Sequence, residues 1–160
     1  MAKSVGAIIE EAKARVEAAN HDEDNLFVMM GTIPADTPKM LAFRKGVVSL
    51  EPTAVEEAKE RGKTIFQKFV KYLTKAVCDD FKYCQRKDEV KKALDKYLPD
   101  IVKAILKRIP ITGKLPPWLV KILGWFGIAA ASIEVLVILF VAWIIVKGCD
   151  ELCGCSDWTP

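Results

Sequence analysis

Residues 122–146 read ILGWFGIAAASIEVLVILFVAWIIV and form an apolar run that contains a single ionisable residue, Glu134. The run is 25 residues long. As one continuous α-helix it would rise roughly 37 Å, which exceeds the ~30 Å hydrocarbon core of a bilayer. The length and apolarity of this run therefore predict a transmembrane helix.

The distribution of charge around the run predicts its orientation. Residues 1–121 carry 23 Lys and Arg against 17 Asp and Glu, whereas residues 122–160 carry Lys147 alone against four acidic residues. Because the cytoplasmic flanks of transmembrane helices are enriched in Lys and Arg, we expect a membrane protein with a cytoplasmic N-terminal domain and a translocated tail. Trp118, Trp125 and Trp143 suit the aromatic belts at the two interfaces.

A second interpretation places the same run inside a soluble protein. A helical hairpin hinged at Ala131-Ser132 could be buried in an all-α bundle, because a helix that is apolar on all sides needs a protein core or a membrane around it. The protein would then be a soluble binding or regulatory module with a buried apolar hairpin and a cysteine-ligated metal.

Upstream of the run, apolar residues recur at helical spacing. Helical patterns cover residues 5–19, 53–84 and 88–108, with an expected break at Pro99, and Thr37-Pro38 resembles a helix start. The short apolar runs 26–30 and 47–50 fit either a small hairpin or packed helices. We expect a mainly α fold, a small cytoplasmic helical domain followed by a C-terminal transmembrane helix. Its parts are a helical soluble domain (1–108), a Pro/Gly linker (109–117), the transmembrane helix (118–147) and a Cys-rich tail (148–160).

Glu134 lies at the middle of the apolar run, where an ionisable side chain costs roughly 2.5–3.5 kcal/mol in a bilayer. On one continuous helix, Gly124, Gly127 and Ala131 would share a face with it. Small residues at such spacing let two helices approach closely, so this face predicts self-association with the carboxyl groups hydrogen-bonded between helices. A proton or ion relay is one alternative role of Glu134, and a residue that is merely tolerated there is the other. The predicted oligomer interface is Gly124, Gly127, Ala131 and Glu134.

The five cysteines are expected to be reduced thiols or metal ligands, because acidic residues replace the apolar core of a secretory signal near the N-terminus. Cys149, Cys153 and Cys155 form a C-x3-C-x-C pattern, and a tetrahedral zinc site requires a fourth ligand, which Cys78 or Cys84 could supply. If the apolar run spans a bilayer, those two cysteines lie on the opposite side from the tail. Acylation of the tail and plain free thiols are the other readings.

No residue pattern predicts catalysis, since His21 is the one histidine and the glycine spacing matches no phosphate-binding loop. Lysine-rich helix faces between Lys63 and Lys107 are more typical of contact with anionic lipid headgroups than with nucleic acid, given the adjacent apolar run. The sequence thus predicts a non-enzymatic, C-terminally anchored membrane protein. Its partners would be the lipid bilayer and copies of itself, with which it assembles through the transmembrane helix as a pore or scaffold.

Overall fold

The computed structural model describes residues 3–35 and 37–155, and within these residues the fold is all-α, with nine α-helices and no strand. A π-helix, η2 (Lys75–Asp80), continues directly from α4 (Pro52–Thr74). The 3-10 turn η1 (Ile33–Ala35) follows α2 (Glu23–Gly31), and the 3-10 turn η3 (Ala130–Ser132) precedes α8 (Ile133–Lys147). The helices are α1 (Val5–Ala18), α2 (Glu23–Gly31), α3 (Pro38–Arg44), α4 (Pro52–Thr74), α5 (Tyr83–Lys92), α6 (Leu94–Arg108), α7 (Pro117–Phe126), α8 (Ile133–Lys147) and α9 (Cys149–Cys153).

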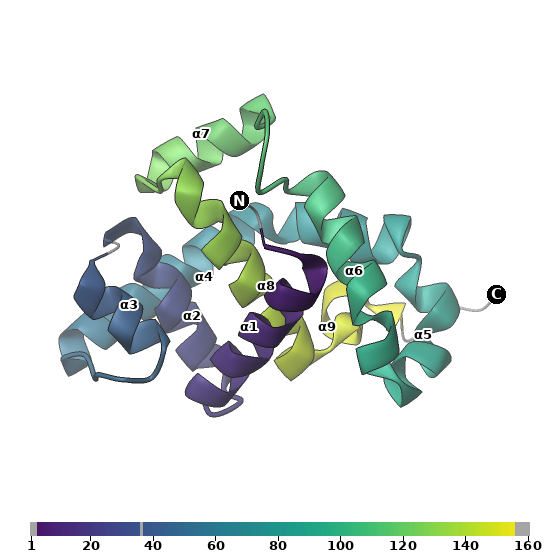
Figure 1. Cartoon of the computed structure of the whole chain (residues 1–160), viewed down its shortest axis with the longest axis horizontal. Helices are drawn as coiled ribbons and strands as arrows, with labels where there is room; N and C mark the ends of the chain where they lie inside the picture. Colours follow the sequence, from purple (N-terminus) through teal and green to yellow (C-terminus); the bar gives the residue numbers. More distant parts are fainter. Residues whose placement is uncertain (1–2, 36, 156–160) are drawn as a thin grey trace.

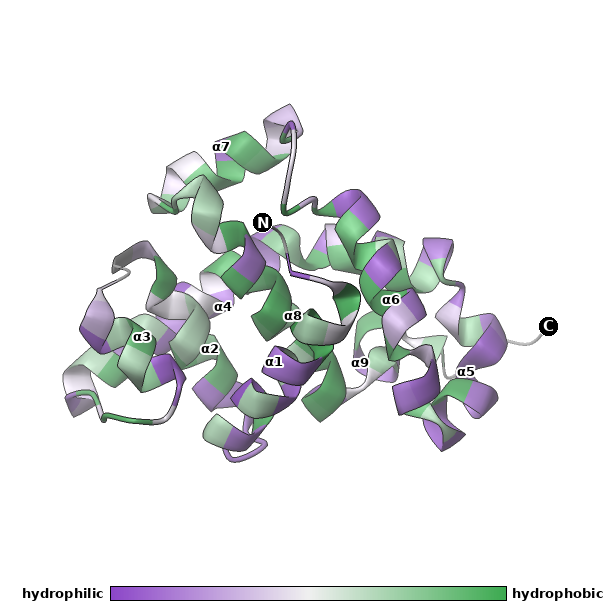
Figure 2. Cartoon of the chain, viewed as in Figure 1, coloured by the Kyte–Doolittle hydropathy of each residue, from purple (hydrophilic) through white to green (hydrophobic). Residues whose placement is uncertain are grey.

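Helix α8 lies at the centre of the bundle, where α1 and α2 pack against it (Figure 1). Between its charged ends it is apolar around its circumference, and Figure 2 shows it mostly in green. Leu136 and every residue from there to Ile144 are buried, and 61% of the residues in the apolar window 130–147 are buried. This burial is what an all-round apolar helix requires when it forms the core of a bundle.

The apolar run is divided between two helices, which differs from the continuous helix expected from the sequence. Helix α7 ends at Phe126 because Gly127 adopts a left-handed conformation with φ of 65°. The N–H of Ile128 donates to the carbonyl of Leu123, and the N–H of Gly127 donates to that of Gly124, which together form a Schellman motif. The apolar character of residues 122–146 does not by itself predict that a helix ends at Phe126. The hinged hairpin that was the second interpretation is closer to the observed path.

Helices α2 and α4 cross in close contact at two glycines. A Cβ atom on Gly31 would overlap the carbonyl oxygen of Ala58, and one on Gly62 would overlap that of Phe27. Gly62, which weakens α4 as an isolated helix, is therefore needed for the approach of the two backbones. This crossing brings α4 alongside the core and leaves its lysine-rich face in solvent.

Four other expectations concern the local structure upstream of the apolar run. The helix expected at residues 5–19 and the start at Thr37-Pro38 are confirmed by α1 and α3, where the Thr37 hydroxyl accepts from the N–H of Met40. Residues 26–30 lie in α2, and no strand forms at 47–50. The break expected at Pro99 falls instead at Ala93, so that Pro99 lies within α6 and removes one backbone hydrogen-bond donor there.

Candidate functional site

Two segments without any acidic residue meet on the surface formed by α4 and α7. Residues 61–78 contain five Lys and Arg and no Asp or Glu, and residues 101–133 have the same balance. Where α4 and α7 face each other, they enclose a groove of about 380 Å³, which we call the basic–aromatic groove. Its lining residues are Gln67, Lys68, Lys71, Tyr72, Trp118, Lys121, Ile122 and Trp125.

The floor of the basic–aromatic groove is built from stacked rings. Tyr72 of α4 and Trp118 of α7 are parallel, with ring centroids 3.5 Å apart. Trp118 also contacts the buried Phe69 edge to face at 6.2 Å. These ring contacts tie α7 to α4, and Leu119, Ile122 and Leu123 bury the other face of α7. The groove is therefore held by packing on both of its walls.

Lysine ammonium groups lie over the rings that line the groove. The Nζ atoms of Lys68 and Lys121 are 5.3 and 5.4 Å from the ring centroid of Trp125, and Lys71 Nζ is 5.0 Å from that of Tyr72. Among the residues that the structure describes, none of these three lysines forms an ion pair with a carboxylate. Their charges are thus held in place by aromatic faces and remain available to an anion.

Helix α7 carries exposed apolar side chains beside these charges. Trp125 is 56% exposed and Val120 is 54% exposed, and α7 projects from the body of the bundle at the top of Figure 1. Trp with Lys beside it is the combination found where a protein meets the headgroup layer of a membrane, because the ring is amphipathic and the ammonium attracts phosphate. The groove therefore offers three ammonium groups and exposed aromatic surface to an anion.

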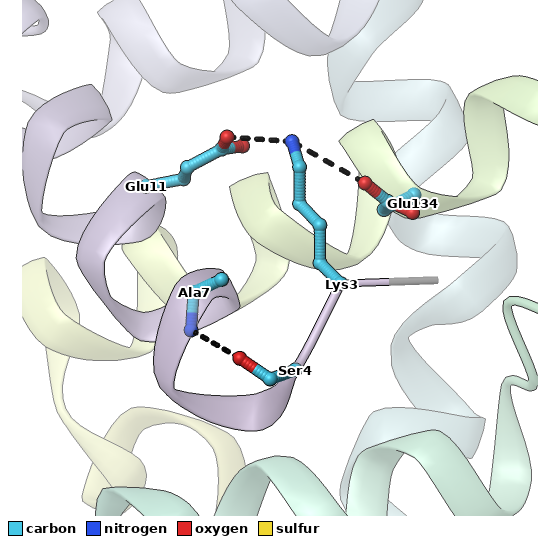
Figure 3. Close-up of polar contacts among 5 residues, drawn as sticks. All are labelled: Lys3, Ser4, Ala7, Glu11 and Glu134. Carbon is cyan, nitrogen blue, oxygen red and sulfur yellow. Dashed lines mark hydrogen bonds and ion pairs between the residues drawn. The ribbon is translucent and has the colours of Figure 1, made fainter. Parts of the chain in front are cut away.

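Glu134 lies in the first turn of α8, where Figure 3 shows it reaching Lys3. Lys3 Nζ is 3.3 Å from Glu134 Oε1 and 2.5 Å from Glu11 Oε1. The hydrogen bond to Glu11 is the main cause that raises the pKa of Lys3, with Glu134 adding to it. The charge of Glu134 is thus matched by an ion pair at the edge of the core, and its side chain is 24% exposed.

The four residues of the predicted oligomer interface do not share one helix face in the structure. Gly124 lies in α7, Gly127 forms its left-handed end, Ala131 lies in η3, and Glu134 begins α8. The face on which the prediction depended is absent because the Schellman motif at Gly127 ends the helix. Gly124, Gly127 and Ala131 are exposed.

Four of the five cysteines are paired in disulfides, in contrast to the expected reduced thiols. Cys78 of η2 is bonded to Cys153, and Cys84 of α5 is bonded to Cys155, with Cα–Cα distances of 5.6 and 5.4 Å. The partners are separated by 75 and 71 residues, so local spacing contained no sign of the pairing. With these bonds formed, residues 78–84 lie on the same side of any bilayer as Cys153 and Cys155.

Cys149, expected as a metal ligand with Cys153 and Cys155, is a buried free thiol. Burial, and next the nearby carboxylate of Asp150, raise its pKa to about 12, so the thiol is protonated at neutral pH. Among the described residues, the sulfurs that gather within ligand distance are those of Cys84, Cys153 and Cys155. Residues 156–160 of the predicted tail lie outside the described part of the chain.

The remaining candidate, His21, is exposed in the turn that follows α1, and its Nε2 lies 3.2 Å from Oε1 of Glu17. This is a surface pair with no nucleophile beside it. Sequence reasoning identified the lysines of α4 and both tryptophans as interfacial residues, but it placed Trp125 inside a spanning helix. It therefore missed the groove, which exists only because α7 is a separate helix packed on α4.

Comparison with known proteins gives no family for this chain. No family model, no curated protein and no solved structure matches it.

Proposed function

We propose that this protein is a non-enzymatic helical bundle that binds anionic membrane surfaces through the basic–aromatic groove. The observation that carries the proposal is the position of Lys68 of α4 and Lys121 of α7, whose Nζ atoms lie 5.3 and 5.4 Å from the ring centroid of the exposed Trp125. An anionic headgroup entering the groove would meet both ammonium groups, while Trp125 and Val120 would contact the acyl-chain boundary. Helix α8 stays in the core in this mode of binding, and the bilayer is the partner.

Charge and salt set the expected strength of this binding. Each basic side chain near an anionic surface contributes about 1 kcal/mol, so three groove lysines contribute about 3 kcal/mol, or roughly a hundredfold in affinity. Screening acts within about 10 Å at 0.1 M salt, so added salt should release the protein. Direct ring insertion is less sensitive to salt, and it should account for the part of the binding that remains.

The test is co-flotation of the full chain with vesicles of phosphatidylcholine, with and without phosphatidylglycerol. Replacing Lys68, Lys71 and Lys121 by Gln should weaken binding to the anionic vesicles roughly a hundredfold. The control replaces Lys39, Lys45 and Lys92 by Gln, which makes the same change in net charge away from the groove. Equal binding of the two triple variants, or equal binding of the parent to neutral and anionic vesicles, would contradict the proposal.

The second candidate function is the anchored, self-associating pore or scaffold expected from the sequence. The observation that favours it is the 18-residue window Ala130–Lys147, whose mean hydropathy of 2.3 makes it long and apolar enough to cross a membrane. It requires α8 to leave α1 and α2. In the flotation experiment, alkaline carbonate distinguishes the two, because a peripherally bound protein is released by it and an inserted one is retained.

A further inference from the structure

Four cysteine sulfurs converge where α9 and the residues just after it meet η2 and α5, and Figure 1 shows α9 lying near α5. The Sγ atoms of Cys84, Cys153 and Cys155 lie within 4.8 Å of one another. Cys78 joins this group because its sulfur is bonded to that of Cys153. Two disulfides are therefore neighbours, and their four sulfurs form one cluster.

We propose that this cluster is a metal site in the reduced protein, with Cys78, Cys84, Cys153 and Cys155 as four thiolate ligands for a tetrahedral, thiophilic divalent cation such as Zn²⁺. A Zn–S bond of about 2.3 Å places the sulfurs of a tetrahedral site about 3.8 Å apart. The sulfurs of Cys84, Cys153 and Cys155 already lie within 4.8 Å of one another, with those of Cys84 and Cys155 joined in a disulfide. Site formation then moves each bonded pair from about 2 Å to about 3.8 Å, which rotation about the cysteine side-chain torsions can supply.

The two states of the cluster are related by a balanced exchange. Two molecules of a dithiol reductant give two electrons and two protons to each protein disulfide in turn, yielding four cysteine thiols and two cyclic disulfides of the reductant. Binding of the metal displaces four protons and forms a complex of charge −2. An azo oxidant reverses the change, because two molecules take four electrons and four protons while two disulfides form again and the metal is released.

The surroundings favour a negatively charged thiolate complex. Cys84 is the second residue of α5, so its sulfur lies at the positive end of a ten-residue helix. Lys87 Nζ lies 3.3 Å from the carbonyl oxygen of Cys155, which places an ammonium group beside the cluster. Cys78, Cys84 and Cys153 are half-buried, so a small reductant and an aqueous metal ion can reach them.

The proposed metal site differs from the one expected from the sequence because it does not include Cys149. The spacing C-x3-C-x-C made it a ligand, yet it is a buried free thiol and is not one of the three sulfurs that lie within 4.8 Å of one another. Cys149→Ser is therefore a matched control, since it removes a thiol from the same tail without removing a proposed ligand.

The experiment uses the full chain. The protein is reduced with excess dithiothreitol in the absence of oxygen, the reductant is removed, and the reduced protein is titrated with Co²⁺. We expect one Co²⁺ per chain, with thiolate-to-cobalt charge-transfer bands and the strong visible absorption of tetrahedral cobalt, and displacement of Co²⁺ by Zn²⁺. Cys153→Ser should lose this spectrum and weaken zinc binding by more than the roughly 10–100-fold typical of outer-shell changes. Cys149→Ser should keep both the spectrum and the affinity.

A second measurement needs no variant and so does not depend on a variant's folding. Diamide added to the zinc-loaded parent should release one zinc per chain and restore the Cys78–Cys153 and Cys84–Cys155 linkages, as read by peptide mapping. The proposal is overturned if the reduced parent, still helical by circular dichroism, binds no Co²⁺ tetrahedrally. It is also overturned if Cys149→Ser loses the spectrum as fully as Cys153→Ser.

Discussion

At the scale of single residues, Glu134 has a charge that the fold stabilises modestly. It lies in the first turn of α8, where the helix dipole favours an acid, and it pairs with Lys3. Because both side chains are partly exposed, we expect Glu134→Gln to lower the free energy of unfolding by only about 0.5–1 kcal/mol, measured by urea denaturation. Glu10→Gln, on an exposed position of α1, is the control and should change nothing. A loss of several kcal/mol would contradict this account, because a partly exposed ion pair with Lys3 cannot stabilise the protein by that much.

At the scale of elements, the close crossing of α2 and α4 depends on two glycines, Gly31 and Gly62, which have no Cβ atom. A Cβ at Gly31 would overlap the Ala58 carbonyl, so Gly31→Ala should lower the free energy of unfolding by about 1–3 kcal/mol, measured by thermal or urea denaturation. Gly124 in α7 has open space around its Cα. Gly124→Ala should therefore stabilise the protein by up to about 1 kcal/mol, since alanine favours the helix. Equal effects of the two substitutions would contradict the close crossing.

Elements also show what could be predicted from the sequence. The amphipathic stripe of α4 and the apolar face of α6 predicted these helices, because burial on one face leaves a period in the sequence. The division of residues 122–146 could not be predicted from apolarity, since Leu and Ile are equally apolar in one helix or two, and only Gly127 signals the stop. The lysines of α4 were predicted as an anionic contact. The contact of Lys68 of α4 with the ring of Trp125 depends on how α7 packs against α4, which no local sequence pattern predicts.

At the scale of the whole molecule, the Cys78–Cys153 bond closes residues 78–153 into a ring. The exposed residues Thr112, Gly113 and Lys114 lie on this ring, between α6 and α7. Limited trypsin treatment that cuts after Lys114 should leave one band at the parent mass on a non-reducing gel. The same sample should separate into residues 1–114 and 115–160 after reduction. Separation without reductant would exclude the observed cysteine pairing.

The ring divides the molecule into unequal parts. It contains α8, while α1 and α2, which cover α8, belong to an open arm that precedes Cys78 and has no covalent tie to the rest of the fold apart from the chain itself. A single disulfide across about 75 residues restricts the unfolded ring by about 4 kcal/mol, and none of that restraint acts on the arm. Neither disulfide therefore ties α1 or α2 to α8, so the cover over the apolar helix is held by non-covalent packing alone.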